Sequence, residues 1–391
     1  MIFKAIKTKN CISMKPKIIR ACTVSDSISF ISGLIPELLK EYEVAVLASP
    51  GKSWSLLDYL GSDVERIEVP MERHISPLKD LKSLCRLIRV FLREKPDMVH
   101  SMTPKAGLLC MMAAWICRVP VRVHTFTGLV FPTAKGLTQK LLILTDRITC
   151  ACATHIIPEG QGVKNDLIDY RITRKPMRVL GYGNVRGIDL EYFNPELPAV
   201  KANAAKIRKP GIFTFIFIGR LVRDKGINEL VEAFSLLHKE IPNTRLILVG
   251  RFEPKLDPLS ANTIEIIDQN PAIEAVGTQE DVRPWLAASD ALVFPSYREG
   301  FPNVVIEAGA MELPSIVTDI NGSSEIIVEG KNGTIISAHD TEALLNSMRL
   351  FVLERGYVRM LCENTRPMVS SRYEQGYVRR CLKVFYKEIL H

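Results

Sequence analysis

The sequence predicts an α/β protein with two doubly wound domains that face each other across a central cleft. With 391 residues, the chain is too long for one ordinary hydrophobic core, and two domains of roughly 150–200 residues are expected. Short apolar strands alternate with helical segments in both halves, which is typical of parallel sheets covered by helices on both faces. Between the halves, residues 190–211 carry three prolines and little apolar periodicity, as expected of a linker.

The individual elements follow from the spacing of the apolar residues. In the first half, strands are predicted at residues 17–24, 43–48, 97–102 and 121–126. The helices between them are predicted at residues 31–42, 77–94 and 105–119. In the second half, strands are predicted at residues 213–220, 244–250, 291–296 and 314–319, with a helix at 227–240.

Domain boundaries follow from this rhythm of strands and helices. Residues 1–195 are predicted to form the N-terminal domain and residues 196–372 the C-terminal domain. The last segment, 373–391, is a predicted helix that packs back on the N-terminal domain. Because ligands of doubly wound sheets bind at the carboxyl ends of the strands, the functional residues are expected there.

Composition limits the class of protein. A hydrophobic fraction of 47% with 24% charged residues is typical of a globular domain, and the net charge of +8 favours an anionic partner. Nucleic acid is not expected, because no basic stretch with interleaved aromatic residues occurs. The nine cysteines are irregularly spaced and are predicted to be buried free thiols in a reducing compartment.

No segment is predicted to cross a membrane. The longest apolar stretch, residues 106–117, is too short to span a bilayer, and residues 1–20 lack the apolar core of a signal peptide. Met14 is an alternative first residue, since the first strand begins at Lys17. We therefore expect a cytoplasmic protein that is either soluble or attached to the inner face of the membrane from one side.

One predicted helix, 78–95, is amphipathic and basic. Its apolar side, expected to cover the sheet, consists of Leu81, Leu84, Leu87, Ile88 and Phe91. Its positive side consists of Lys79, Lys82, Arg86, Arg89 and Arg93. An ordinary sheet-covering helix is the main interpretation, and a helix at a membrane surface is the alternative.

Two cations follow the first strand of the second domain, in the motif GRLVRDKG. Arg220 ends the predicted strand, and Lys225 follows five residues later, beside Gly219 and Gly226. Glycine lets the backbone approach a ligand closely, and two cations at a strand end suit a diphosphate. The alternative is a solvated turn with two surface charges.

Two carboxylates flank a turn in the run SYREGFPNVVIEAGAMELP. Glu299 precedes a predicted helix and Glu307 lies about one turn inside it, with seven residues between them. Pro302 suits the start of a helix, and the N-terminal amides around residues 301–304 would favour an anion. Because carboxylates accept hydrogen bonds from pairs of hydroxyls, the pattern predicts a sugar joined to a ribose through a diphosphate. The alternative is an ordinary acidic helix N-terminus.

The motif GRLVRDKG followed by PSYREGFPNVVIEAGA resembles the retaining glycosyltransferases of family 4, which have the GT-B fold. Further similar segments are VHSMTPKAGLL, VPVRVHTFTGL, RGIDLEYF and VGTQEDVRPWLAASDALVFPSYREG, so the resemblance covers most of the chain. The set is similar to bacterial enzymes that build capsular, O-antigen and other surface glycans on undecaprenyl diphosphate. The resemblance implies two Rossmann-like domains, a nucleotide-sugar donor and a lipid-linked glycan acceptor.

The resemblance also implies roles for single residues. Glu299 and His124 are the catalytic candidates, both in contact with the donor sugar, while Glu307 contacts the ribose. Arg220 and Lys225 hold the diphosphate. The other donor-binding candidates are Gly219, Arg251 beside the nucleobase, Gly300, Phe301, Pro302 and Asn303.

Two residues are candidates for binding the acceptor. Lys105 lies in the loop TPKAG just before a helix and is expected to contact a phosphate, with a surface lysine as the alternative. Ser27 lies in TVSDSISFISG, where many relatives have a Gly-rich loop after the first strand. Relatives also often have glycine where Glu312 stands, and Glu312 is expected to be an exposed residue at a helix end.

No metal or other cofactor is expected, because the sequence has no D-x-D motif and its histidines lack ligand-like spacing. Arg220, Lys225 and the helix amides are expected to stabilise the departing diphosphate instead. The expected reaction moves an N-acetylhexosamine or hexose from a UDP-sugar to a lipid-linked acceptor with retention. Two alternatives remain: a nucleotide-sugar epimerase of the same fold, and a non-catalytic carbohydrate-binding protein.

Overall fold

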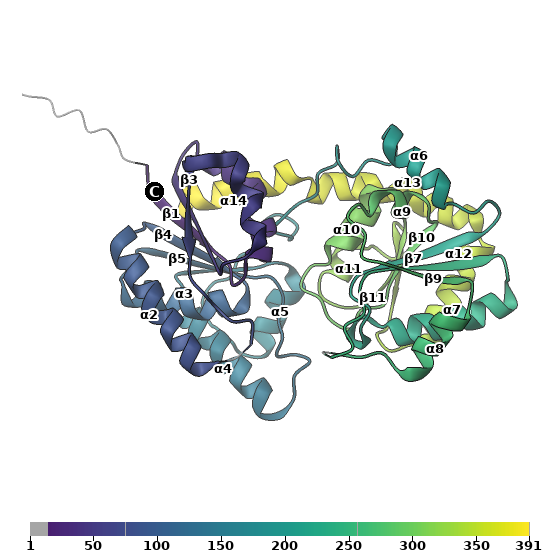
Figure 1. Ribbon diagram of the computed structural model, residues 1–391, viewed down its shortest axis with the longest axis horizontal. Helices are drawn as coiled ribbons and strands as arrows, with labels where there is room; N and C mark the ends of the chain where they lie inside the picture. Colours follow the sequence, from purple (N-terminus) through teal and green to yellow (C-terminus); the bar gives the residue numbers. More distant parts are fainter. Residues whose placement is uncertain (1–14, 75, 256, 391) are drawn as a thin grey trace, which may run out of the picture. The chain divides into compact units, whose positions relative to one another are not determined.

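The computed structural model describes residues 15–74, 76–255 and 257–390. Within these residues, two six-stranded sheets form, and helices cover both faces of each (Figure 1). Every strand pair with an assigned register is parallel. The predicted α/β class with two doubly wound sheets is therefore confirmed. The alternative start at Met14, and Cys11, lie outside the described residues.

The first sheet has the strand order β3-β2-β1-β4-β5-β6. Its strands are β1 (Lys17–Ala21), β2 (Glu43–Ala48), β3 (Val64–Glu68), β4 (Met98–Met102), β5 (Val121–Phe126) and β6 (His155–Pro158). The second sheet has the order β12-β11-β10-β7-β8-β9. Its strands are β7 (Phe213–Ile218), β8 (Thr244–Val249), β9 (Ile273–Gly277), β10 (Ala291–Phe294), β11 (Ser315–Thr318) and β12 (Gly333–Ile336).

Helices connect these parallel strands. Up to β7 they are α1 (Ile35–Leu38), α2 (Pro77–Glu94), α3 (Pro104–Ile116), α4 (Gly136–Cys152), α5 (Gln161–Asp169) and α6 (Pro198–Ile207). From β7 to β11 they are α7 (Ile227–Glu240), α8 (Ala261–Gln269), α9 (Arg283–Ala287) and α10 (Asn303–Ala310). After β11 they are α11 (Ser323–Ile326), α12 (Thr341–Leu353), α13 (Arg355–Tyr373) and α14 (Gln375–Leu390). Short 3-10 helices are η1 (Ser25–Phe30), η2 (Ser32–Leu34), η3 (Lys52–Asp63) and η4 (Arg223–Lys225).

The central strands are the ones that the sequence predicted, since they are apolar almost throughout. In β7 and β8 nearly every residue is buried, because both faces of the sheet are covered by helices. The strands end one to three residues before their predicted ends at β7, β8, β10 and β1, where residues leave the sheet to form loops. The predicted helix α7 covers its sheet with an apolar face that includes Ile227, Leu230, Val231, Phe234 and Leu237.

Sequence reasoning missed the four edge strands, β3, β6, β9 and β12. Three of them, β3, β9 and β12, mix buried residues with partly exposed ones, and β6 has only four residues. An edge strand has one neighbour and less cover, so its sequence does not form a long apolar run. These strands were therefore recognisable only by their pairing in the sheet.

Other predictions need correction. The predicted helix at residues 31–42 is broken into the 3-10 turn η2, the four-residue helix α1 and turns, because Gly33 and Pro36 interrupt it. The predicted linker 190–211 contains α6, whose buried Val200 and Ala204 pack toward α9. In α2, Leu81 is 59% exposed, and the buried residues are Ser83, Leu87 and Phe91.

Contacts divide the chain into two compact units. The first consists of the described residues up to His124, Ile148–His155 and the described residues from Tyr386 onward. The second consists of Thr125–Arg147 and Ile156–Phe385. The end of α14 belongs to the first unit, where Tyr386 packs edge-on against Tyr42 and Lys387 pairs with Glu41. The predicted domain boundaries at 195 and 372 stay predictions.

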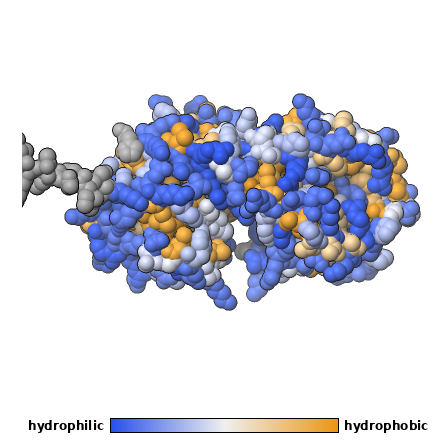
Figure 2. Space-filling model, turned by 90° about the horizontal axis from the view of Figure 1, so that it is seen from above, coloured by the Kyte–Doolittle hydropathy of each residue, from blue (hydrophilic) through white to orange (hydrophobic). Residues whose placement is uncertain are grey.

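The surface of the protein is mainly hydrophilic on the face viewed in Figure 2, and its described cysteines differ in burial. Figure 2 shows hydrophilic residues over most of the viewed face, with hydrophobic residues in separate patches. None of the helices in the described part of the chain is long and apolar enough to cross a membrane. All described cysteines are free, but only Cys22, Cys110 and Cys150 are buried, and Cys85 is exposed.

Glu312 closes α10 in a backbone conformation that favours glycine. Glu312 is exposed and has φ = 63°, in the left-handed region. The amides of Leu313 and Glu312 donate to the carbonyls of Ala308 and Gly309, at 2.9 and 3.1 Å. This is the Schellman pattern, with Glu312 at the position that favours glycine.

We expect Glu312→Gly to raise the free energy of unfolding by about 1 kcal/mol, because glycine adopts a positive φ without strain. Chemical denaturation of the two proteins would measure this difference. Glu312→Ala is the control, since alanine keeps the Cβ that causes the strain. Equal stability of the Gly and Ala variants would contradict the explanation.

Candidate functional site

The turn after β7 is held against the end of β10 by a glycine. Gly226, which follows η4, has φ = 70°. A Cβ at this position would lie 2.1 Å from the carbonyl oxygen of Pro295. Only glycine allows this approach, and it brings η4 beside the loop that follows β10.

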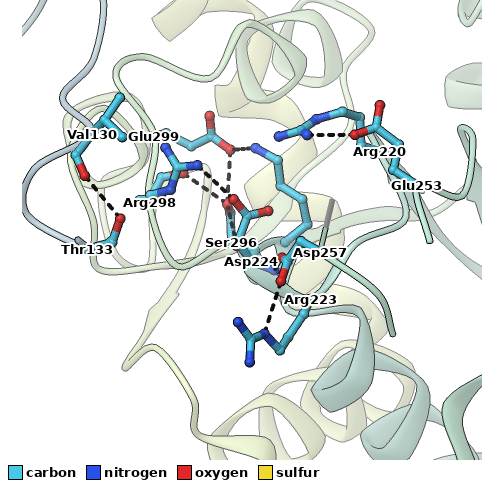
Figure 3. A network of polar contacts seen from close by, with 11 residues as sticks. Val130, Thr133, Arg220, Arg223, Asp224, Glu253, Asp257, Ser296, Arg298 and Glu299 are labelled. Carbon is cyan, nitrogen blue, oxygen red and sulfur yellow. Dashed lines mark hydrogen bonds and ion pairs between the residues drawn. The ribbon is translucent and has the colours of Figure 1, made fainter. Parts of the chain in front are cut away.

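Lys225 and Glu299 form an ion pair at this point (Figure 3). Both side chains are largely buried, with 14% and 18% of their surfaces exposed. The same oxygen of Glu299 accepts a hydrogen bond from the Ser296 hydroxyl at 2.9 Å. The Lys225 ammonium also lies 5.6 Å from the ring centroid of Phe294. The carboxylate of Glu299 is thus oriented by two donors.

Further contacts fix the loop 296–299 on η4. The Arg298 guanidinium donates to Asp224 Oδ2 at 3.0 Å, and the Tyr297 amide donates to the Asp224 carbonyl at 2.9 Å. Asp257 in turn accepts hydrogen bonds from the Asp224 amide at 2.6 Å and from Arg223 Nε at 3.1 Å (Figure 3). The position of Glu299 is therefore determined by three separate segments of the second unit.

Arg220 and Arg251 share one carboxylate. Arg220 Nη1 lies 2.9 Å from Glu253 Oε2 (Figure 3), and Arg251 Nη2 lies 2.9 Å from Glu253 Oε1. The hydrogen bond from Arg220 is the main cause that lowers the pKa of Glu253. Both arginines are well exposed, at 43% and 70%, so they stay accessible to an anionic ligand.

Backbone contacts between glycines bring the strand ends of β7 and β8 together. A Cβ on Gly250 would lie 1.7 Å from the Gly219 carbonyl oxygen. A Cβ on Gly300 would similarly lie 2.3 Å from the Thr127 carbonyl oxygen. Gly219 and Gly300 thus serve close backbone packing in this structure.

Helix α10 begins without a side-chain cap. Pro302 is its N-cap residue, and the proline side chain offers no hydrogen-bond acceptor to the first amides. Phe301 is 5% exposed, and its ring packs edge-on against Tyr373 with centroids 5.5 Å apart. Phe301 therefore anchors the start of the helix, which leaves the N-terminal amides available for an anion.

A segment in which the sequence predicted no site residue contacts the face of α10 that carries Glu307. Asn184 Nδ2 donates to Asn303 Oδ1 at 2.9 Å, and Arg186 Nη1 lies 3.5 Å from Glu307 Oε1. Burial raises the pKa of Glu307, and the charge of Arg186 opposes this effect. Since Asn303 and Glu307 are four residues apart, they share one side of the helix.

A third carboxyl group, Glu159, was also missed. It follows β6 and is 6% exposed. Burial raises the pKa of Glu159 to about 8; a hydrogen bond from the Val185 amide opposes this, and the charges of Glu299 and Glu325 add to it. Glu159 is therefore mostly protonated at neutral pH. The sequence carries no signal for Glu159, because no neighbouring charged residue forms a recognisable motif with it.

In the first unit, His124 lies two residues before the end of β5 and is 1% exposed. Its Nδ1 lies 2.9 Å from the Ser101 hydroxyl, and a Cβ on Gly107 would lie 2.4 Å from the ring. Burial lowers the pKa of His124 to about 3, with Ser101 opposing the shift. The imidazole is therefore neutral, and it can act through hydrogen bonds but not as a charged acid.

The two residues that were predicted to bind the acceptor, Lys105 and Ser27, differ in their surroundings. Lys105 Nζ is bonded to Asp80 Oδ2 at 2.5 Å and to the His74 carbonyl at 2.9 Å, and its side chain is only 10% exposed. Ser27 lies in η1, and 9% of it is exposed. Lys105 is therefore already paired and Ser27 is largely buried, and their roles in binding the acceptor stay predictions.

The pKa of Glu159 predicts a dependence of stability on pH. An ordinary glutamate titrates near 4.5, so between pH 4.5 and about 8 unfolding releases a proton and stability falls as the pH rises. Below pH 4.5 both states are protonated and the effect is absent. The variant Glu159→Gln cannot ionise, so its advantage in unfolding free energy should grow by up to about 1.4 kcal/mol per pH unit in this window.

Urea denaturation at pH 6 and pH 7.5 would measure this growth. Glu342→Gln, at an exposed position of α12, is the matched control. If the wild type and Glu159→Gln lose stability in parallel between these pH values, the carboxyl group is not protonated in the folded protein.

Comparison with known proteins identifies the family. Residues 31–183 match the family described as "Glycosyl transferase 4-like domain", and residues 212–352 match "Glycosyl transferases group 1". The capsular polysaccharide biosynthesis glycosyltransferase CapM of Staphylococcus aureus is 31% identical over 376 residues, which cover 96% of this chain and 97% of that protein.

Two further proteins support this result. The UDP-Gal:alpha-D-GlcNAc-diphosphoundecaprenol alpha-1,3-galactosyltransferase of Escherichia coli is 31% identical over 86% of this chain and 87% of its own length. The crystal structure of Anabaena HepE in complex with UDP and glucose has the same fold, with a TM-score of 0.77 at 16% identity over 95% of this chain and 100% of that chain. The chain therefore belongs to the family 4 glycosyltransferases of the GT-B fold.

Proposed function

We propose that this protein transfers a hexose or an N-acetylhexosamine from a UDP-sugar to a lipid-linked glycan diphosphate in the synthesis of a surface polysaccharide. The observation that carries the proposal is the arrangement around the start of α10. There, the oriented carboxylate of Glu299, the buried Glu307 and the cation Lys225 surround a helix N-terminus that has no side-chain cap. Such a set can bind both ends of a nucleotide sugar.

Each group has a proposed contact. Glu299 accepts hydrogen bonds from hydroxyls of the donor sugar, and Glu307 accepts them from the ribose. Lys225, Arg220 and the first amides of α10 bind the diphosphate, while Arg251 borders the nucleobase. Gly219, Gly300, Phe301, Pro302 and Asn303 shape the site. The UDP complex of HepE and the UDP-Gal donor named for the E. coli relative are consistent with a UDP-sugar.

The proposed reaction retains the anomeric configuration. The bond between the anomeric carbon and the diphosphate oxygen breaks, and the acceptor hydroxyl forms a bond to the same face of that carbon. The hydroxyl proton passes to the departing diphosphate oxygen. In this scheme Glu299 orients the sugar and need not be the nucleophile, and Lys225 and Ser296 hold one of its oxygens in place. The neutral imidazole of His124 contributes a hydrogen bond to the donor sugar.

No metal is needed in this scheme, because cations and amides of the protein stabilise the leaving diphosphate. The acceptor places the enzyme at the cytoplasmic face of the membrane, as a peripheral protein. The name of the E. coli relative describes an acceptor of this kind, a sugar on diphosphoundecaprenol.

We expect transfer activity that is resistant to EDTA and lost in Glu299→Gln. The purified protein would be incubated with a panel of UDP- and GDP-sugars, EDTA, and membrane extract that contains undecaprenyl-diphosphate sugars, while release of UDP or GDP is followed. Glu280→Gln, at an exposed position, is the matched control and should keep full activity.

Other outcomes would replace the proposal. A sugar that is altered without extract would indicate an epimerase. Binding of UDP-sugars that is unchanged in Glu299→Gln, with no turnover of any donor, would indicate a carbohydrate-binding protein. Activity that EDTA abolishes and Mg²⁺ restores would contradict the metal-independent mechanism.

The two diphosphate cations should differ in importance. Lys225 is 14% exposed and Arg220 43%, so a charge lost at Lys225 is less easily replaced by water. We expect Lys225→Met to lower kcat/KM by roughly 30- to 4,000-fold, about 2–5 kcal/mol, and Arg220→Met to lower it less.

Steady-state kinetics with saturating acceptor would test this order. Because Lys225 also orients Glu299, the double variant Lys225→Met/Glu299→Gln is the control. Since Glu299→Gln is expected to lack activity, the affinity for UDP is compared instead. If Lys225 acts on the diphosphate, the double variant binds UDP less tightly than Glu299→Gln alone, whereas equal affinities would mean that Lys225 serves only to position Glu299.

A further inference from the structure

We infer that a basic pocket of the first unit binds the diphosphate group of the lipid-linked acceptor, an assignment that rests on the proposed function. The pocket has a volume of about 570 Å³. It lies beyond the carboxyl ends of β1, β2 and β3, where Val24, Ser49 and Pro70 line it, and beside the first half of α2. This edge of a doubly wound sheet is where ligands bind.

Positive charge dominates the pocket. The lining includes the cations Arg73, Lys79, Lys82 and Arg86 and one carboxylate, Glu72. Glu72 pairs with Lys79 at 2.7 Å. No carboxylate of the described residues lies within ion-pair distance of Lys82 or Arg86. The two charges are therefore available for an anionic ligand.

These charges are unfavourable for α2 itself. Lys82 and Arg86 are four residues apart, so they are neighbours on the helix and repel each other. Lys79 also lies in the first turn of the helix, where the helix dipole disfavours positive charge. A bound diphosphate would relieve both effects, because it supplies negative charge to several cations at once.

The pocket walls are held in place before any ligand binds. The Ser49 hydroxyl donates to the Thr23 carbonyl at 2.7 Å and accepts from the Met71 amide at 2.7 Å, which joins the ends of three strands. The Ser83 hydroxyl donates to the Pro70 carbonyl at 2.6 Å and ties α2 to the end of β3. The cations of α2 are thus presented on a rigid frame.

Lys105, which the sequence predicted as the phosphate contact, is already neutralised by Asp80. We therefore expect Lys82 and Arg86, and not Lys105, to contact the phosphate groups of the acceptor. Next to these cations, Leu78 and Leu81 are 86% and 59% exposed. An anion pocket bordered by exposed leucines suits a diphosphate that is attached to a lipid, because the apolar side chains can contact the lipid surface.

Two doubly substituted variants test the assignment. Lys82→Gln/Arg86→Gln removes two charges from the pocket, and Arg89→Gln/Arg93→Gln removes two from the same helix outside the pocket lining. Calorimetric titration with inorganic pyrophosphate, with saturating UDP present to occupy the donor site, measures anion binding. We expect the affinity to fall at least 10-fold in the pocket variant and to stay unchanged in the control.

Kinetics provide a second measurement. With a short-chain prenyl-diphosphate-linked N-acetylglucosamine as acceptor, the pocket variant should raise the acceptor KM at least 10-fold and leave the donor KM unchanged. Circular dichroism and thermal unfolding verify that both variants fold. An unchanged acceptor KM together with unchanged pyrophosphate affinity overturns the pocket assignment and leaves the proposed transferase intact.

The remaining outcomes separate the two proposals and the source of the anion. If no donor and acceptor pair turns over, but only the pocket variant loses pyrophosphate affinity, the pocket binds a diphosphate, and its assignment to the acceptor falls together with the proposed function. Sedimentation with phosphatidylglycerol vesicles, compared with phosphatidylcholine vesicles, tests the phospholipid headgroup. Loss of vesicle binding in the pocket variant with unchanged pyrophosphate affinity and acceptor KM overturns the assignment.

Discussion

The ion pair between Lys225 and Glu299 is the interaction on which the arrangement of the proposed donor site depends. It joins the turn after β7 to the loop after β10, and Ser296 and Asp224 extend the connection on either side. The pair is largely buried, so breaking it would leave a charge in a poorly solvated place. The loop before α10 therefore has one strongly preferred position, and the carboxylate that is proposed to orient the sugar is fixed with it.

Glycines make this arrangement possible because several backbones meet without room for a side chain. Gly226 lies against the Pro295 carbonyl, and Gly300 lies against the Thr127 carbonyl. Gly183 lies in the same way against the Glu159 carbonyl and the Phe301 ring. As a result, the buried carboxyl group of Glu159 and the start of α10 belong to one packed region, and the raised pKa of Glu159 follows from that packing.

The cations of the two units differ in whether a carboxylate pairs with them. In the second unit, Arg220, Arg251 and Lys225 each have a carboxylate partner, Glu253 or Glu299, so a donor diphosphate must compete with existing ion pairs. In the first unit, Lys82 and Arg86 have no carboxylate partner among the described residues, so an anion meets unpaired charge. Competition with protein carboxylates weakens binding but adds selectivity, whereas unpaired cations attract an anion from a longer distance.

The sequence by itself determined the fold class, the central strands and the residues around α10, because buried parallel strands are continuous apolar runs and the motifs are local. It even indicated that Glu312 ends a helix. Only the tertiary structure decided which groups are paired and which are free. The edge strands were defined by their neighbours, Glu159 and Arg186 came to the region around α10 from distant segments, and Lys105 was neutralised by Asp80. Ion pairing and burial depend on contacts between residues far apart in the chain, and such contacts cannot be inferred from the local pattern of polar and apolar residues.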